Sequence, residues 1–482
     1  MGPLGNLKQT SKAWLKRGLT RAVRAQSKGA AIPASHWGLH VNAAGQLALG
    51  DLQLSDLRDQ YGSPLHVVDL DRLRGNARAF LDKPFGRANA CEVYSSYKTN
   101  PLPGVLTELH ACGVGAEVIS HYELWLALKL GVPPRHIIFN GPGKSEASLR
   151  QAVELGIELI NVNHREELEL LIAIAKQLGR KPRVGLRVTF GGWAGQFGIP
   201  AAGGEALAAF RYAKESGALD VVALHVHRGG MLSSASELDS HVGGVLSFAD
   251  LLERELELRL EVLDVGGSLA SRSVRSLSAR ELRLNMTFGR ELPAPEPSAS
   301  LSIRQYTSLL LERVEAHYQA RGRQAPRIFV EPGRALTSDT QFLLTSVMSV
   351  KQGAERYHAI LDAGINLAES CRSEYHQVLA LKPGAGNERI YTLVGPICSP
   401  GDTLRWACAL PELRNGDGLA IMDAGAYFVP FATSFSFPQP AVIAVSDGRV
   451  QQLRRAETFE DLIAYDTPTS LVPGALGTTG AG

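Results

Sequence analysis

The sequence has little of several features that would place a protein in a special class. Its five cysteines include no CxxC pair, and no apolar run approaches the roughly 18 residues that span a membrane. We therefore expect no disulfide framework, no metal site and no membrane association. The net charge of +2 gives no reason to expect a nucleic-acid partner. These absences favour a cytoplasmic globular enzyme that acts on a small molecule.

Acidic residues are absent from the start of the chain, where the first one is Asp51. Seven lysines and arginines lie between positions 8 and 28. No apolar core of a secretory signal accompanies them, and serines are few for a transit peptide. We predict a basic N-terminal extension over residues 1–36, either helical or disordered, and assign it no role.

Strand-like and helix-like segments alternate from residue 63 to residue 333. This rhythm predicts an α/β fold, a (β/α)8 barrel of the TIM type. The stretch 270–300 interrupts the rhythm, and its prolines at 293, 295 and 297 predict a loop. The predicted barrel strands are 65–70, 92–98, 115–119, 136–140, 157–162, 183–189, 221–227, 259–265 and 327–330.

Beyond Pro332 the pattern changes to short strand-like segments that are joined by turns, with little helix. This predicts a C-terminal all-β domain over residues 334–465, and we expect the strands of 37–62 to join it. Residues 466–482 are predicted to be a flexible tail. The predicted strands are 342–351, 357–362, 389–394, 402–409, 418–423, 441–446 and 449–453.

Lys98 directly follows a strand-like run, Val93 to Tyr97. A lysine in this place is most often a solvated charge. It can also be an amine held at the mouth of a barrel, ready to form a Schiff base with a carbonyl cofactor. Nothing near Lys98 in the sequence decides between the two, so the other strand ends must.

Polar and glycine-rich stretches follow several other predicted barrel strands. A glycine pair after a strand is usually a turn, and a histidine there is often structural. The barrel rule nevertheless places the carboxyl ends of all strands at one mouth. The stretches lie at Glu117, Arg187, 225–230, 264–268 and 330–334.

The order of these stretches resembles the fold type III decarboxylases that use pyridoxal 5′-phosphate, the group of diaminopimelate, ornithine and arginine decarboxylases. The resemblance covers roughly residues 60–445 and rests on several motifs in sequence. Ser95-Ser-Tyr-Lys-Thr-Asn100 is similar to Y-A-x-K-x-N, and Glu331-Pro-Gly-Arg334 matches E-P-G-R. The other motifs are 115–124 (G-x-D-V-x-S-x-x-E-L), 140–145 (N-x-x-x-K-S), 196–198 (K-F-G), 224–227 (L-H-x-H), 263–267 (L-D-x-G-G), 395–402 (G-P-x-C-x-x-x-D) and 425–427 (G-A-Y).

The resemblance implies roles for the matching residues. Lys98 would carry the cofactor as an internal aldimine, His227 would stack on its ring, and Glu331 would keep the ring nitrogen protonated. Racemases of this fold carry an arginine there, so Glu331 favours decarboxylation through a quinonoid. Cys398 is implied to be catalytic in the neighbouring subunit's site, which implies a homodimer. The further cofactor-binding residues that we predict are Gly266, Gly267, Gly333, Arg334, Tyr427 and Arg187.

The departures from the family pattern concern substrate recognition. An acid that holds the distal ammonium of the substrate follows the family cysteine, but Ser399 stands here. A neutral serine cannot balance a buried ammonium. Arg372 lies one residue from the place of the arginine that binds the distal carboxylate in diaminopimelate enzymes, three residues before Tyr375. Arg228 is either a carboxylate ligand or a solvated loop residue. We count these four as candidate substrate-binding residues.

Two positions near the phosphate also differ from the family, Gly230 and Ser268. We predict decarboxylation of an amino acid or amino-acid conjugate whose side chain lacks the usual ammonium. Three alternatives stay open. They are diaminopimelate or basic amino-acid decarboxylation with shifted recognition residues, a pyridoxal-phosphate-dependent racemase, epimerase or aldolase, and a non-catalytic regulatory homologue.

Overall fold

The computed structural model describes residues 31–83, 91–191, 195–353, 356–384 and 388–467. Residues 1–30 of the predicted basic extension (1–36) and residues 468–482 of the predicted tail (466–482) lie outside the described residues. Among the helices that are described, none combines the length and the apolar character needed to cross a bilayer.

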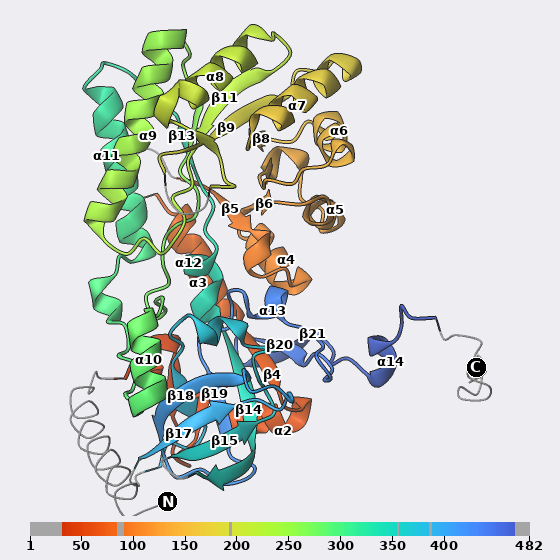
Figure 1. The fold of residues 1–482 in the computed structure, drawn as a ribbon, viewed down its shortest axis with the longest axis vertical. Helices are drawn as coiled ribbons and strands as arrows, with labels where there is room; N and C mark the ends of the chain where they lie inside the picture. The colour runs from red at the N-terminus through yellow and green to blue at the C-terminus, as the bar shows by residue number, and fades with distance from the viewer. Residues whose placement is uncertain (1–30, 84–90, 192–194, 354–355, 385–387, 468–482) are drawn as a thin grey trace, which may run out of the picture.

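The described residues form a closed barrel of eight parallel strands, as the sequence predicted (Figure 1). Pairing of β8 with β9 and of β13 with β5 closes the cylinder. A short strand β10 (Ile199–Pro200) pairs with β9 beside it. The barrel strands are β5 (Glu92–Ser96), β6 (Gly115–Val118), β7 (Ile137–Phe139), β8 (Leu159–Val162), β9 (Arg183–Thr189), β11 (Asp220–His225), β12 (Val262–Asp264) and β13 (Arg327–Val330).

Helices surround the barrel and bury their apolar faces against the strands. Four of them begin at a serine whose side chain accepts a hydrogen bond from the third helical N–H, namely Ser120, Ser145, Ser234 and Ser302. Such caps satisfy amide groups that the helix itself leaves free. The helices are α3 (Leu70–Leu81), α4 (Pro103–Ala111), α5 (His121–Lys129), α6 (Glu146–Leu155), α7 (Arg165–Leu178), α8 (Glu205–Glu215), α9 (Ala235–Leu256) and α11 (Ile303–Gln319).

The barrel interior is filled by a small cluster that only strand residues supply. Tyr94 and Phe329 lie at its centre with ring centroids 4.8 Å apart. Val93, the neighbour of Tyr94, belongs instead to the core that the strands share with the helices. Successive side chains of a strand point to opposite faces, so the lumen is packed and only the strand ends are open to a ligand.

The C-terminal region is a second, mostly antiparallel sheet. One predicted barrel strand belongs here: β4 (Leu65–Asp69) pairs with β14 and β20, so its assignment to the barrel was wrong. Both faces of β4 are buried, which gives it the apolar run of a barrel strand. The other strands are β14 (Gln341–Gln352), β15 (Tyr357–Leu361), β16 (Val378–Ala380), β17 (Arg389–Val394), β18 (Thr403–Leu410), β19 (Gly418–Ile421), β20 (Ala441–Ser446) and β21 (Arg449–Arg454).

Three N-terminal strands, β1 (Leu39–Val41), β2 (Leu47–Leu49) and β3 (Leu52–Gln53), form a small sheet of their own. They do not extend the C-terminal sheet, but together with α2 (Leu54–Tyr61) they share a core with it. One backbone hydrogen bond, from Leu47 N to Leu381 O, links the two sheets.

The predicted loop 270–300 contains a helix, α10 (Ala279–Phe288). Ser278 and Glu281 form a capping box at its start. The helix packs on β18, where Asn285 Nδ2 donates to Ala407 O over 3.1 Å. The insertion therefore ties the barrel to the C-terminal sheet.

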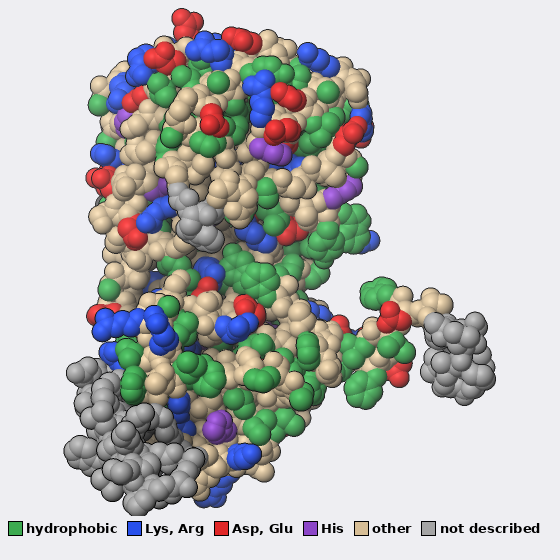
Figure 2. Space-filling model, in the orientation of Figure 1, with side chains coloured by type: hydrophobic (Ala, Val, Ile, Leu, Met, Phe, Trp, Pro, Cys, Tyr) green, Lys and Arg blue, Asp and Glu red, His purple; other side chains and the backbone are tan. Residues whose placement is uncertain are grey.

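The last described segment projects from the body beyond β21 and carries α14 (Phe459–Leu462) (Figure 1). Hydrophobic side chains are exposed on it beside acidic ones (Figure 2). Phe459, Ile463 and Tyr465 are 76%, 55% and 98% exposed.

Candidate active site

Lys98 lies in the turn Tyr97–Thr99 directly after β5, at the carboxyl end of the barrel. Its Nζ donates to Ser96 Oγ over 2.7 Å and to Glu117 Oε2, at the end of β6, over 3.1 Å. Burial alone would lower the pKa of Lys98. The charges of Glu117, Tyr427 and Glu331 outweigh burial and hold this pKa above its ordinary value. The amine is thus a protonated group of the site.

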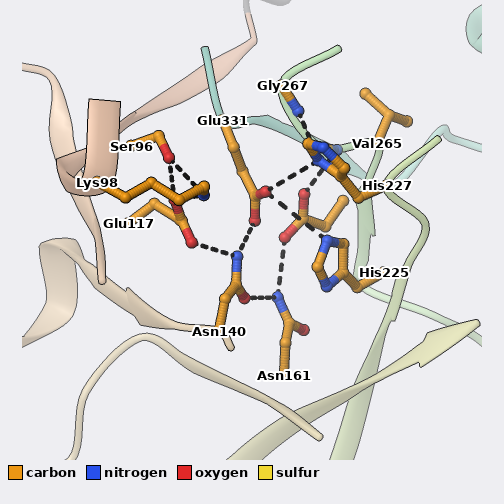
Figure 3. A network of polar contacts seen from close by, with 12 residues as sticks. Ser96, Lys98, Glu117, Asn140, Asn161, His225, His227, Val265, Gly267 and Glu331 are labelled. Carbon is orange, nitrogen blue, oxygen red and sulfur yellow. Dashed lines mark hydrogen bonds and ion pairs between the residues drawn. The ribbon is translucent and has the colours of Figure 1, made fainter. Parts of the chain in front are cut away.

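Two asparagines connect the carboxylates of three strand ends (Figure 3). Asn140 Nδ2 donates to Glu117 Oε1 over 3.0 Å and to Glu331 Oε1 over 2.5 Å. Asn161 Nδ2 donates to Asn140 Oδ1 over 2.8 Å and to Asp264 Oδ2 over 2.9 Å. All five side chains are buried, and a buried polar network of this kind fixes the positions of its members.

Asp264 and Glu331 form a buried pair of carboxyl groups. Burial, followed by the charge of Glu331, raises the pKa of Asp264 well above its ordinary value. Burial acts on Glu331 in the same sense, but His225, His227 and a hydrogen bond with Asp264 lower its pKa below the usual range. The pair therefore holds one proton, on Asp264, and leaves Glu331 ionised toward the cleft.

Two histidines lie against the ionised Glu331. His227 Nδ1 accepts a hydrogen bond from Gly267 N over 3.2 Å and lies 3.8 Å from Glu331 Oε2. His225 Nε2 lies 3.7 Å from the same oxygen, and burial lowers the pKa of His225 to about 3. Its ring is neutral at neutral pH, and neither nitrogen has a hydrogen-bond partner in the described chain.

The same three side chains bring one donor atom each within 4.8 Å of one another. Imidazole and carboxylate groups at this spacing can hold a transition metal as well as face a ring nitrogen. The absence of a metal site stays a prediction from the sequence.

The loops after β12 and β13 form a cradle in which only glycine fits. A Cβ on Gly267 would lie 1.6 Å from Glu331 O, and a Cβ on Gly333 would lie 2.4 Å from Thr99 Oγ1. Gly266 has a φ of +69°, which favours glycine. The buried hydroxyls of Thr99 and Ser268 have no hydrogen-bond partner among the described residues. Backbone close to a ligand and free hydroxyls suit a phosphate group.

Arg334 pairs with a carboxylate and a ring of the C-terminal region. Its Nη1 donates to Glu374 Oε2 over 2.7 Å, and its Cζ lies 4.4 Å from the centre of the Tyr427 ring. Tyr427 is joined to the Lys98 turn, because its backbone N–H donates to Thr99 O over 2.9 Å. Sequence reasoning did not find Glu374 as the partner of this arginine.

A cleft of about 460 Å³ opens above these groups. It brings together Lys98, His227, Glu331, Arg187 and Arg228 of the predicted site residues. Arg187 lies over the Phe197 ring, with Cζ 4.7 Å from its centre. The prediction did not single out Asn161, although its place inside the apolar run of β8 was a usable signal. Asn140, Glu117 and Asp264 were noted only as motif residues.

The predicted phosphate-side residues Gly266, Gly267, Gly333, Arg334 and Tyr427 do not line this cleft within the described chain, and neither do four further predicted residues. Cys398 and Ser399 are exposed on a loop after β17 that the buried carboxylate of Asp402 holds, accepting from Ile397 N over 2.9 Å. Arg372 is exposed and lies 3.8 Å from Glu369. Tyr375 is buried, and its hydroxyl donates to Gln377 Oε1 over 2.7 Å.

Sequence and structure relate the chain to known proteins. The model of the family described as "Pyridoxal-dependent decarboxylase, pyridoxal binding domain" matches residues 78–338. The chain is 30% identical to the diaminopimelate decarboxylase of Vibrio cholerae over 438 residues, 88% of this chain and 97% of that protein. It is 29% identical to that of Aquifex aeolicus over 434 residues, 87% and 95% of the two chains. A crystal structure of the Helicobacter pylori diaminopimelate decarboxylase complexed with L-lysine superposes with a TM-score of 0.70 at 26% identity, covering 85% of this chain and 98% of that one.

This chain therefore belongs to the pyridoxal-dependent decarboxylases. Its cofactor is pyridoxal 5′-phosphate and its class is that of the amino-acid carboxy-lyases, which confirms the resemblance and both predictions. The residues described above fit that group. The Lys98 amine and the ionised Glu331 line the cleft, and the unpartnered hydroxyls of Thr99 and Ser268 lie with the glycine cradle.

Proposed function

We propose that this enzyme decarboxylates an α-amino acid, or an amino-acid conjugate, whose side chain carries no distal ammonium. One observation carries the proposal. Within the described residues two carboxylates line the cleft, Glu117 and Glu331, and both are engaged with Lys98, Asn140 and the histidines. At the place where the resembling enzymes carry an acid after the cysteine, Ser399 stands. A desolvated ammonium would find no free counter-charge.

The roles of the residues follow from their atoms. When bound, pyridoxal phosphate supplies an electron-withdrawing ring that accepts the electron pair left as CO₂ departs. Lys98 Nζ holds the cofactor and returns a proton to the substrate, with Ser96 Oγ and Glu117 Oε2 orienting the amine. Glu331 holds a proton at the ring nitrogen, and its ionised state requires Asp264 to keep the proton of the pair.

The other residues of the cofactor end would act through the room that they leave, through a ring or through charge. Gly266, Gly267 and Gly333 would leave room for the phosphate beside the free hydroxyls of Thr99 and Ser268. The N–H groups of Gly266 and Gly267 already donate to Asp264 Oδ1 and His227 Nδ1. The His227 ring supports the cofactor from one side because its Nδ1 is fixed by Gly267 N. Arg334 acts on Tyr427 and Glu374 and contributes charge at longer range.

The active form is a homodimer in this proposal. Cys398 is exposed and lies outside the cleft of its own chain, so its catalytic role requires a second subunit. The projecting segment with Phe459, Ile463 and Tyr465 supports the same assembly, because apolar side chains on an arm are typical of an interface (Figure 2).

Diaminopimelate decarboxylation is the second candidate, because several similar proteins bear that name. In that case the enzyme must hold the distal ammonium of diaminopimelate although Ser399 is neutral and the cleft offers no free acid among its described residues.

A panel of amino acids separates the two. CO₂ release with pyridoxal phosphate present is measured for meso-diaminopimelate, L-lysine, L-2-aminopimelate and L-norleucine. We expect a higher kcat/KM for 2-aminopimelate, which lacks only the distal amine, than for diaminopimelate. Preference for diaminopimelate would establish the second candidate, and no CO₂ from any amino acid would contradict both.

A further inference from the structure

Arg228 directly follows His227, at a position that the cofactor does not require. It lines the cleft that contains Lys98, and 38% of its side chain is exposed. Within the described residues its single hydrogen-bond partner is Glu237, whose Oε1 accepts from Nη2 over 3.2 Å. A guanidinium has five N–H donors, so most of those on Arg228 are not used by the protein.

Hydrogen bonds hold the Glu237 carboxylate in place, so it can position the Arg228 side chain. It occupies the first turn of α9, where its Oε2 accepts from Ser233 N over 2.9 Å and from Ser234 N over 3.1 Å. These hydrogen bonds and the one from Arg228 lower the pKa of Glu237 to about 2. The carboxylate is therefore ionised at neutral pH and holds one end of the guanidinium beside the cleft.

The charges of the cleft are unevenly distributed. Both of its carboxylates belong to the cofactor end, where Glu117 pairs with Lys98 and Glu331 lies against the histidines. Arg187 also lies at that end, where burial lowers its pKa and the charges of Glu331 and Glu117 partly offset that effect. The outer end has Arg228 and no carboxylate of the cleft lining.

We propose that Arg228 binds the distal anionic group of the substrate. The substrate class is then an α-amino acid whose side chain ends in a carboxylate and carries no distal ammonium. This rests on the proposed function and deepens it, since the absence of an acid explains only what the site rejects. A charge-assisted pair from a planar guanidinium to a carboxylate explains what the site selects.

The test uses the dimeric, cofactor-loaded enzyme with two probes, L-2-aminopimelate and L-norleucine. Arg228→Gln should lower kcat/KM for aminopimelate by about 30-fold, mainly through KM, and change that for norleucine by less than about 3-fold. Arg228→Lys keeps the charge without the planar fork and should recover part of the loss. Because both probes are measured on one preparation, a folding defect would lower both values together.

Arg313→Gln is the matched control. Arg313 forms a comparable exposed pair with Asp239 at 3.0 Å and lies outside the cleft, so neither probe should change. Equal losses for both probes in Arg228→Gln, or no loss for aminopimelate, would overturn the proposal. Either result leaves decarboxylation itself intact, whereas failure of the proposed function would appear as no CO₂ from any probe in the unaltered enzyme.

Discussion

The two ends of the cleft are built differently. At the cofactor end, side chains from six barrel strand ends share one buried network, and two glycines in it have no room for a Cβ. At the substrate end, Arg228 lies on a loop with a single support, and Gly229 beside it has open space around it. In the account proposed above, the rigid end holds the cofactor and the loop end selects the substrate, so we expect a substitution to cost more at the first end than at the second.

At the cofactor end, we expect substitution of Glu331 to have the largest effect on activity. Glu331→Gln cannot hold a proton at the ring nitrogen, so we expect kcat for CO₂ release to fall about 100-fold, or ~2.7 kcal/mol of barrier. Asp264→Asn keeps a hydrogen-bond donor toward Glu331 and should cost no more than about 10-fold. CO₂ assays on both variants, with cofactor occupancy measured by absorbance, check this. Equal effects would show that the proton of the pair is not on Asp264.

The same glycine-to-alanine substitution, made once at each end of the cleft, compares the two ends directly. Gly267→Ala puts a Cβ 1.6 Å from Glu331 O, and the backbone there must move, so the Kd for pyridoxal phosphate should rise about 30-fold. Gly229→Ala has nothing within 4 Å and meets only the backbone cost of a φ of +73°, about 1 kcal/mol, with a Kd change below about 3-fold. Fluorescence titration of the two apoenzymes gives both values, and circular dichroism confirms folding. Similar Kd values would remove the distinction between the ends.

We expect a smaller effect on how the free energy of unfolding depends on pH. Burial lowers the pKa of His225 to about 3, below its unfolded value, so the unfolded chain binds the proton that the folded one excludes. The free energy of unfolding should therefore fall as the pH drops below about 6.5, by ~2 kcal/mol between pH 7 and pH 5. His225→Asn should remove that part of the dependence. Urea denaturation of the apoenzyme at several pH values measures it.

The same measurement on His40→Asn, at an exposed position of β1, controls for the exchange of a histidine for an asparagine. If His225→Asn and the unaltered protein lose stability in parallel between pH 7 and pH 5, His225 is not the buried neutral group described above.

The sequence predicted the barrel well because each strand is an apolar run between turn signals, followed by a helical period. It misplaced β4, because a strand buried on both faces reads the same in a barrel and in the middle of another sheet. It also read 270–300 as a loop. The prolines there outweighed the capping-box signal of Ser278 and Glu281, which predicts the start of α10.

The cofactor end was largely predictable, because Lys98, His227 and Glu331 occupy motifs at strand ends. Asn161 was missed, since a single asparagine inside a strand shows its partners only when the strands are side by side. The pairing of Arg334 with Glu374 could not be foreseen either, because it joins the barrel to the C-terminal region. Cys398 and Ser399 lie outside the cleft of their own chain, so their predicted place in a second subunit's site stays a prediction.

Two lysines lie near the cleft, and one measurement decides between them. Lys98 is 37% exposed with its amine in the cleft, whereas Lys144 Nζ is buried in an ion pair of 2.7 Å with Glu167. The enzyme saturated with pyridoxal phosphate is reduced with borohydride, digested and mapped by mass spectrometry. We predict the phosphopyridoxyl group on Lys98 alone. A label on Lys144, or no label on any lysine, would contradict the assignment of this cleft as the cofactor site.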